Sequence, residues 1–453
     1  MTKNKTLFLL FFLLITLTSW LLYQNAFTAY FFQDDWYTLS ISKDPANFFI
    51  PNPKIIYYRP LGMQIPFFLL RSIFGLNVLP FHLLTFFTII LNSYLAYLVS
   101  KIITKKTITS LLITFLYSTS TIHFIPMYWT STYAFVLGTT FFLLSFIFYL
   151  SPKHLKGGRM DSFQVKESGN PTMVSLFLYS LGLLTNELVI TLPAILFAYE
   201  LILGSKNLKK AVPFGLLSLF YLGLRFFLFA PPTKGDYIQS IGINIIHNAK
   251  AYFLWSFNLP DEIKAQFLNF FQINPQFIKD FPSFTTILLV TFFINLIIYL
   301  LGAYKNPKIF FFGFSWFLLG LTPVIFFPKH SFSYYLEISL IGLLLPYALF
   351  ISRFSLLNFS LLSLFLLTWV ISSFNTIKFN ELIHWAPQRA ANSLRLITEI
   401  KKKYPNEKST VYVLNTPENR YSLNGEEAVK VFFKNPKIRT IYTQEAPGKH
   451  LIR

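Results

Sequence analysis

Long apolar stretches, each about as long as a bilayer is thick, most strongly restrict how this chain can fold. A membrane-spanning helix needs about 20 mostly apolar residues, because in lipid its backbone groups must bond to each other. Eleven such stretches lie near 7–24, 77–99, 107–124, 130–150, 172–186, 187–204, 211–230, 283–303, 308–327, 334–352 and 354–374. Only 13% of the residues are charged, against about 25% in a soluble domain. The chain is therefore predicted to be an all-α polytopic membrane protein.

Three segments leave the count of spans open. The fifth and sixth stretches are short and meet at Thr185-Asn186, which indicates a tight turn or a re-entrant pair. Residues 60–75 are too few to span and contain Arg71, so they are predicted to form a helix at the interface, within the first outer loop. Residues 241–260 are read in the same way. The first stretch also has the features of a secretory signal, although no A-x-A-like site follows it.

The distribution of basic residues predicts the orientation. Cytoplasmic loops are enriched in Lys and Arg. With the N-terminus in the cytoplasm, the inner loops hold fifteen Lys and Arg, and the longer outer loops hold nine. An odd number of spans then places the tail outside the cytoplasm, and a bacterial plasma membrane is the expected location.

The tail differs from the rest of the chain in composition. It is rich in charged residues, with a helical pattern over 386–403 and a second helix candidate at 425–433. Strand-like segments lie at 410–414 and 439–443. We predict a transmembrane domain over residues 1–374 and a small extracytoplasmic α/β module over residues 375–453.

Several classes of function lack support in the sequence. The absence of cysteine excludes disulfides, thiolate metal sites and cysteine nucleophiles. No Walker-type GK[ST], H-E-x-x-H or G-x-G-x-x-G motif is present, so nucleotide hydrolysis, zincin proteolysis and dinucleotide chemistry are not indicated. The net charge of +20 would suggest nucleic acid in a cytosolic protein. In a membrane protein it reflects the loops, and no nucleic-acid partner is expected.

Two adjacent carboxylates, Asp34 and Asp35, follow the first span within FFQDDWYTL. Burial beside aromatic residues would raise the pKa of one of them, which suits a general base. The pair could equally supply oxygen ligands to a divalent cation, so such a cofactor is possible but not demanded. A solvated turn explains the same residues.

Further along this loop stands Tyr57-Tyr58-Arg59-Pro60-Leu61. The planar guanidinium of Arg59 suits a phosphate group, with Tyr58 beside it. An aromatic and basic interface anchor explains the motif equally well.

Ionisable residues inside spans are costly, so each is a candidate for function. Glu187 and Arg225 lie toward the outer ends of their spans. His330, Tyr334 and Glu337 are spaced i, i+4 and i+7, and they share one face if the tenth helix begins early.

One outer cavity could gather most of these groups, since all lie in the predicted outer half of the membrane. The members would be Asp34, Asp35, Arg59, Glu187, Arg225, His330 and Glu337. Separate pairs that only hold helices together are the alternative. Glu200, near an inner end, is interpreted as structural.

Four short motifs together resemble the GT-C membrane glycosyltransferases. They are the acidic pair in DDW, the YRPL segment, the TNEL segment where relatives often carry an S-K-E-like triplet, and KHSFSYYLEIS, which resembles H/E-R-Y-Y-L-x. The most similar members are polyprenyl-phosphate-sugar users of the protein-mannosyltransferase and aminoarabinose-transferase type. The resemblance covers residues 1–374. Asn186 replaces the lysine of the triplet, and the tail is shorter than several relatives' domains.

The resemblance implies a function and roles for single residues. The family's first-loop carboxylate, a catalytic base or electrostatic anchor, matches Asp34 or Asp35. Its phosphate-binding basic residues match Arg59, with Arg225 and Lys329 as further candidates. The expected reaction moves a sugar from a polyprenyl-phosphate-linked donor to a lipid, glycan or protein acceptor on the extracytoplasmic face, with inversion. A transporter or flippase of a lipid-linked saccharide, and a non-catalytic membrane scaffold, are the alternatives.

Overall fold

The chain folds into two compact units, each assembled from separate stretches of sequence. The computed structural model describes residues 3–51, 55, 58–154, 170–229, 235–352, 359–404, 410–445 and 451–452. One unit, here called the helical unit, comprises residues 1–22, 87–124 and 135–380. The other, here called the mixed unit, comprises residues 23–86, 125–134 and 381–453. The first loop and the C-terminal tail therefore belong to the same folded body.

Each of the eleven predicted stretches contains a helix. These are α1 (Lys3–Tyr23), α5 (Leu79–Thr104), α6 (Thr107–Ser118), α8 (Tyr133–His154), α9 (Pro171–Leu183), α10 (Leu192–Ile202), α11 (Val212–Leu228), α14 (Pro282–Lys305), α15 (Pro307–Leu321), α16 (Ser339–Ile351) and α17 (Phe359–Ile383). Two shorter helices of the helical unit, α12 (Asn244–Trp255) and α13 (Pro275–Asp280), lie between α11 and α14. The mostly helical architecture is therefore confirmed.

Helix length separates these elements into two groups. Within the part of the chain that the structure describes, seven helices are long and apolar enough to cross a membrane. In contrast, α9, α10, α15 and α16 have 13, 11, 15 and 13 residues. A 13-residue helix rises only about 20 Å, less than the roughly 30 Å of a hydrocarbon core. The predicted start of the tenth stretch was wrong, because a 3₁₀ helix at Ser333–Leu336 delays α16 until Ser339.

The doubtful join between the fifth and sixth stretches is a tight turn. The amides of Thr185 and Asn186 both donate to the Gly182 carbonyl, which ends α9. The Asn186 side chain accepts a hydrogen bond from the amide of Leu188 and so caps the 3₁₀ helix η5 (Glu187–Thr191). Helix α10 follows directly.

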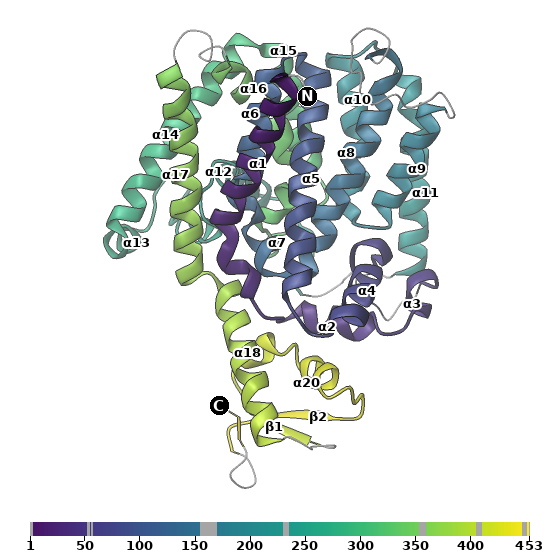
Figure 1. Ribbon diagram of the computed structural model, residues 1–453, viewed down its shortest axis with the longest axis vertical. Helices are drawn as coiled ribbons and strands as arrows, with labels where there is room; N and C mark the ends of the chain where they lie inside the picture. The colour runs from purple at the N-terminus through teal and green to yellow at the C-terminus, as the bar shows by residue number, and fades with distance from the viewer. Residues whose placement is uncertain are drawn as a thin grey trace. The chain divides into compact units, whose positions relative to one another are not determined.

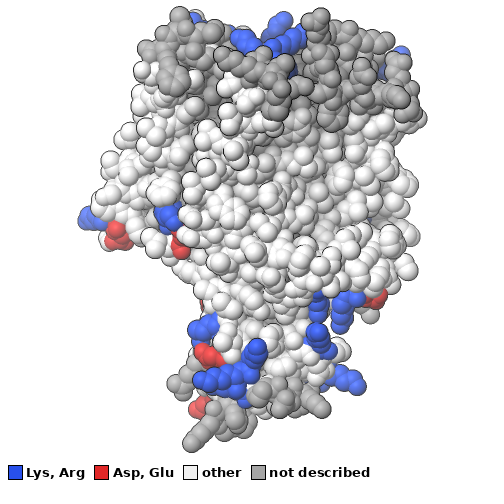
Figure 2. Space-filling view, viewed as in Figure 1, with Lys and Arg blue, Asp and Glu red and all other residues white. Residues whose placement is uncertain are grey.

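Close contacts between helix backbones and aromatic side chains hold the helical unit together. A Cβ added to Gly313 of α15 would lie 2.3 Å from the carbonyl oxygen of Gly342 in α16, so only glycine allows this approach. In Figure 1, α1 and α5 run side by side, and their rings meet where Phe8 contacts Tyr97 at a centroid distance of 5.3 Å. On the face in Figure 2, the described residues of this unit leave a broad band without charged side chains, as a lipid-facing surface requires.

The mixed unit combines short helices with a two-stranded sheet. Its elements are η1 (Gln24–Thr28), α2 (Asp34–Ile41), α3 (Ala46–Phe49), the π-helical turn η2 (Pro60–Gln64), α4 (Ile65–Phe74), α7 (Phe124–Tyr128), η4 (Thr130–Thr132), α18 (Trp385–Lys403), β1 (Thr410–Leu414), α19 (Pro417–Ser422), α20 (Glu427–Phe432) and β2 (Arg439–Thr443). The two strands are parallel and pair Thr410 with Arg439 through Leu414 with Thr443. Both strands coincide with the segments expected from the sequence.

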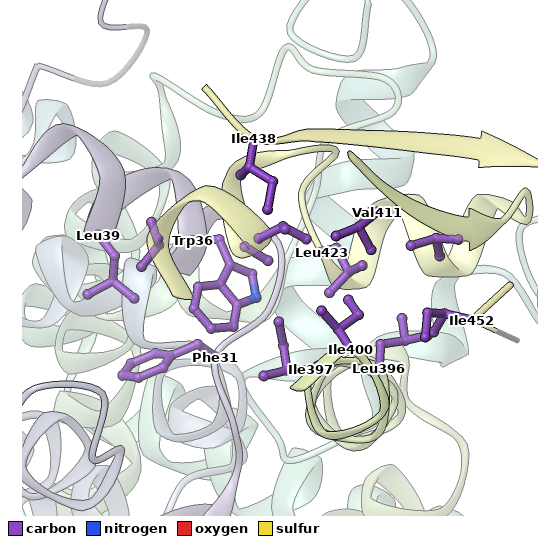
Figure 3. Packing of buried hydrophobic residues seen from close by; sticks show 14 of the residues in the cluster. Phe31, Trp36, Leu39, Leu396, Ile397, Ile400, Val411, Leu423, Ile438 and Ile452 are labelled. Carbon is purple, nitrogen blue, oxygen red and sulfur yellow. The ribbon is translucent and has the colours of Figure 1, made fainter. Parts of the chain in front are cut away.

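A hydrophobic core joins the first loop to the tail within the mixed unit. Figure 3 shows Trp36 of α2 between Phe31 and the tail residues Ile397 and Leu423. Trp36 is fully buried, and its indole nitrogen donates to the hydroxyl of Ser393 in α18 at 3.1 Å. Helix α2, which carries the two aspartates, is therefore held in place by residues about 350 positions later in the chain.

Candidate functional site

The two aspartates occupy the first turn of α2, where the partial positive charge of a helix N-terminus favours carboxylates. Their neighbourhoods differ. Asp35 is fully buried. Its Oδ1 accepts hydrogen bonds from the Thr130 hydroxyl at 2.9 Å and from the Ser131 amide at 2.7 Å. Its Oδ2 accepts one from the Phe32 amide at 3.2 Å. This side chain ties α2 to the segment at 130–131.

Asp34 is the more accessible carboxylate of the pair. It is only half-buried, and the described residues give its side chain no hydrogen bond. Burial raises the pKa of Asp34 to about 6, and the positive charge of Arg59 opposes part of that rise. Near neutral pH this group is mostly ionised and can still accept a proton, which is what a general base requires.

Burial also raises the pKa of Asp35, to about 7, although its hydrogen-bond donors favour the charged form. All three donors belong to the protein and occupy both oxygens. Asp35 therefore has both carboxylate oxygens bonded within the protein, whereas the Asp34 carboxylate is partly exposed.

Arg59 directly precedes the π-helical turn η2. Pro60 begins that turn, and the Arg59 amide donates to the Gln64 side chain at 3.2 Å. The hydroxyl of Tyr58 donates to the Phe48 carbonyl at 3.0 Å, which anchors this segment to α3. Of the predicted site residues, Arg59 is thus close enough to Asp34 for its charge to lower the pKa of that carboxylate.

Glu187 and Arg225 form an ion pair in the helical unit. The Arg225 Nη2 and Glu187 Oε1 atoms lie 2.6 Å apart, with about a quarter of each side chain exposed. The pair joins η5 to the last turn of α11. Sequence reasoning selected both residues but did not predict that they bind each other.

Glu337 belongs to a buried network of the helical unit. Its carboxylate lies 2.8 Å from His123 Nδ1 and accepts a hydrogen bond from the Tyr117 hydroxyl at 2.6 Å. All three side chains are fully buried. Sequence reasoning missed His123 and Tyr117, although an ionisable residue at the end of the third apolar stretch was a usable signal for His123. Glu200 is also buried, and it accepts hydrogen bonds from Tyr149 and Ser205.

The expected shared face of His330, Tyr334 and Glu337 does not form, because no helix runs through residues 330–337. His330 packs against the ring of Tyr237 at a centroid distance of 4.2 Å. Tyr334 is buried against Phe135, 4.8 Å between centroids. Lys329 is exposed.

A preformed metal site was left open by the sequence. In the described ranges, no group of three His, Cys, Asp or Glu side chains is arranged to hold a metal ion. Asp34 and Asp35 remain the only predicted ligands, and a cation bound there would need further ligands from substrate or water.

Comparison with solved structures identifies the fold. The chain is similar to the apo oligosaccharyltransferase of the archaeon Archaeoglobus fulgidus, with a TM-score of 0.53, 12% identity, and coverage of 96% of this chain and 64% of the other. It is also similar to AglB of the same organism in complex with an inhibitory peptide and a dolichol-phosphate, with a TM-score of 0.51, 13% identity, and coverage of 98% and 65%. The sequence itself matches no family model and no curated protein.

At this identity the likeness is one of fold, and the chain spans less than two thirds of the length of these neighbours. The neighbours are membrane glycosyltransferases of the GT-C superfamily, so the predicted GT-C-like fold is confirmed.

Proposed function

We propose that this protein transfers a sugar from a polyprenyl-phosphate-linked donor to an acceptor on the extracytoplasmic face of the membrane. The observation that carries the proposal is the half-buried carboxylate of Asp34, whose pKa is raised by burial and lowered in part by the positive charge of Arg59. The GT-C fold supports it, as does a neighbour of this fold solved with a dolichol-phosphate. The outward orientation predicted from the basic residues fits a donor that is itself anchored in the membrane.

The reaction is a direct displacement at the anomeric carbon. Asp34 takes the proton of the acceptor's nucleophilic group while the acceptor atom bonds to the anomeric carbon. The bond from that carbon to the phosphate oxygen breaks, and polyprenyl phosphate departs. Arg59 stabilises the negative charge that develops on the phosphate. One displacement inverts the configuration at the anomeric carbon.

Other charged residues are proposed to support the reaction at Asp34 and Arg59. Asp35 fixes the first turn of α2 through Thr130, Ser131 and Phe32. In the helical unit, the Glu187–Arg225 pair carries partly exposed charge and is proposed to contact the donor or acceptor. Lys329, exposed and basic, is proposed as a further phosphate contact.

The test is sugar transfer by the purified protein in lipid vesicles. The donors are a panel of radiolabelled undecaprenyl- and dolichyl-phosphate sugars, with a membrane lipid extract and peptides as acceptors, measured with Mn²⁺ or with EDTA. Asp34→Asn removes the base but keeps the shape of the side chain, so transfer should fall by about 100-fold or more.

Asp44→Asn is the matched control. Asp44 lies in the same loop and is exposed, and its side chain accepts a local hydrogen bond from the Ala46 amide, which asparagine can also accept. This variant should transfer sugar at the parental rate. Full activity of a normally folded Asp34→Asn protein would defeat the proposal, and transport of labelled lipid without transfer would establish a flippase instead.

A further inference from the structure

Gln33, the residue directly before the acidic pair, has a backbone conformation that side chains rarely adopt. Its φ is 48° and its ψ is −125°. Glycine enters this region readily, whereas a Cβ atom clashes with the backbone there. Such strain persists only where surrounding contacts enforce it, and it concentrates at functional sites.

Residues of the C-terminal tail supply the contacts that hold Gln33. The Gln33 amide donates to the Ser422 carbonyl at 3.4 Å. The Gln33 side-chain oxygen accepts a hydrogen bond from Nη1 of Arg389 at 2.7 Å. Both partners come from tail helices, α18 and α19, within the mixed unit.

Arg389 is itself rigidly placed. Its Nε lies 3.1 Å from the Glu418 carboxylate. Its guanidinium lies over the rings of Trp385 and Tyr421, 4.9 and 4.4 Å from their centroids. A planar, braced guanidinium presents a fixed donor, which a flexible lysine would not.

The conformation of Gln33 sets the direction of the first turn of α2. The Trp36 amide donates to the Gln33 carbonyl at 3.1 Å, and the Asp35 amide donates to the Phe32 carbonyl at 3.0 Å. Asp34 lies between these two hydrogen bonds, so relaxation of Gln33 to an ordinary conformation would rotate the Asp34 carboxylate relative to Arg59.

We propose that the tail positions the catalytic carboxylate: Arg389 holds Gln33 in its strained conformation, and Gln33 thereby directs Asp34 toward Arg59. Arg389 and Gln33 are positioning residues, and the tail is part of the working site. This inference rests on the proposed role of Asp34.

The decisive experiment compares two truncations of Gln33. Gln33→Ala and Gln33→Gly both remove the amide that Arg389 holds, but only glycine keeps the backbone conformation without strain. Gln33→Ala should lower kcat roughly 10- to 100-fold, the cost of misplacing a catalytic group by about 1 Å. Gln33→Gly should stay within about threefold of the parent, although glycine is ordinarily the more disruptive substitution.

Arg389→Ala supplies the second arm. As a single substitution it should lower kcat as much as Gln33→Ala does. In the Gln33→Gly protein it should cause little further loss of kcat. Lys402→Ala is the matched control, because Lys402 is an exposed basic residue near the end of the same helix. It should leave kcat unchanged.

The pH profile separates positioning from general damage. In the parent, the acidic limb of kcat/KM follows Asp34, whose pKa is about 6 with Arg59 lowering it. In Gln33→Ala and Arg389→Ala this limb should move to higher pH, since the carboxylate turns away from Arg59.

The inference would be overturned if Gln33→Ala and Gln33→Gly lowered kcat equally. It would also be overturned if Arg389→Ala lowered kcat as much in the Gln33→Gly protein as in the parent. An active Asp34→Asn protein would instead defeat the proposed function. The two failures are therefore distinguishable.

Discussion

Substituting Asp35 by asparagine should change the stability of the protein in opposite ways at low and high pH. The Oδ1 atom of asparagine can still accept from Thr130 and Ser131, but its amide nitrogen faces the Phe32 amide that Asp35 Oδ2 now accepts. One buried donor loses its partner, which costs about 1–3 kcal/mol. At pH 5, where native Asp35 is protonated, Asp35→Asn should be less stable than the parent by that amount.

Raising the pH removes this advantage of the parent. The folded pKa of Asp35, about 7, lies above its ordinary value of 3.8, so the folded state holds a proton that the unfolded state has released. Stability from this group is fully present below the unfolded pKa and is lost as pH rises through the folded pKa. Between pH 5 and pH 8 the loss is about 2.6 kcal/mol. Asparagine does not titrate, so at pH 8 the variant should equal or exceed the parent.

Thermal unfolding in detergent at pH 5 and pH 8 measures this crossover. Scaled to the 453 residues of the chain, each 1 kcal/mol should move the midpoint by roughly 1 °C. Other titrating groups, Asp34 included, are shared by both proteins and cancel in the comparison. A variant that is destabilised equally at both pH values would refute the reasoning, because Asp35 would then be ionised throughout and its hydrogen bonds would outweigh its burial.

Two further predictions concern the helical unit. Gly313→Ala should strongly destabilise or misfold the protein, because the new Cβ would lie 2.3 Å from the Gly342 carbonyl oxygen. Gly223→Ala is the control, since a Cβ there would have nothing within 4 Å, and its yield of folded protein in detergent should match that of the parent. Glu337→Ala should cost about 3–5 kcal/mol, because it strips the buried His123 ring of its carboxylate. Glu337→Gln should lower the free energy of unfolding by less than Glu337→Ala does, as measured by the same thermal assay. Equal losses in the two variants would contradict a role for the network in stability.

Elements defined by local pattern were predictable. Apolar runs form helices because lipid offers no hydrogen-bond partner for the backbone. Short segments of alternating apolar and polar residues, bounded by turn residues, correctly predicted β1 and β2. The proximity of Asp34 to Arg59 also followed from their common loop. In contrast, no local pattern could show that Asp35 is buried and hydrogen-bonded while Asp34 is only half-buried. The residues that bond to Asp35, Thr130 and Ser131, lie about 95 positions away in the sequence.

The sequence by itself determined that this is a helical membrane protein, where its apolar helices lie, and which loop carries the acidic pair. Each of these depends on residues close together in the chain. The tertiary structure decided that the first loop folds with the tail, that Arg389 holds Gln33, and that Glu337 is buried with His123. These features depend on partners hundreds of residues apart, and only the packing of the folded chain selects which distant side chains meet.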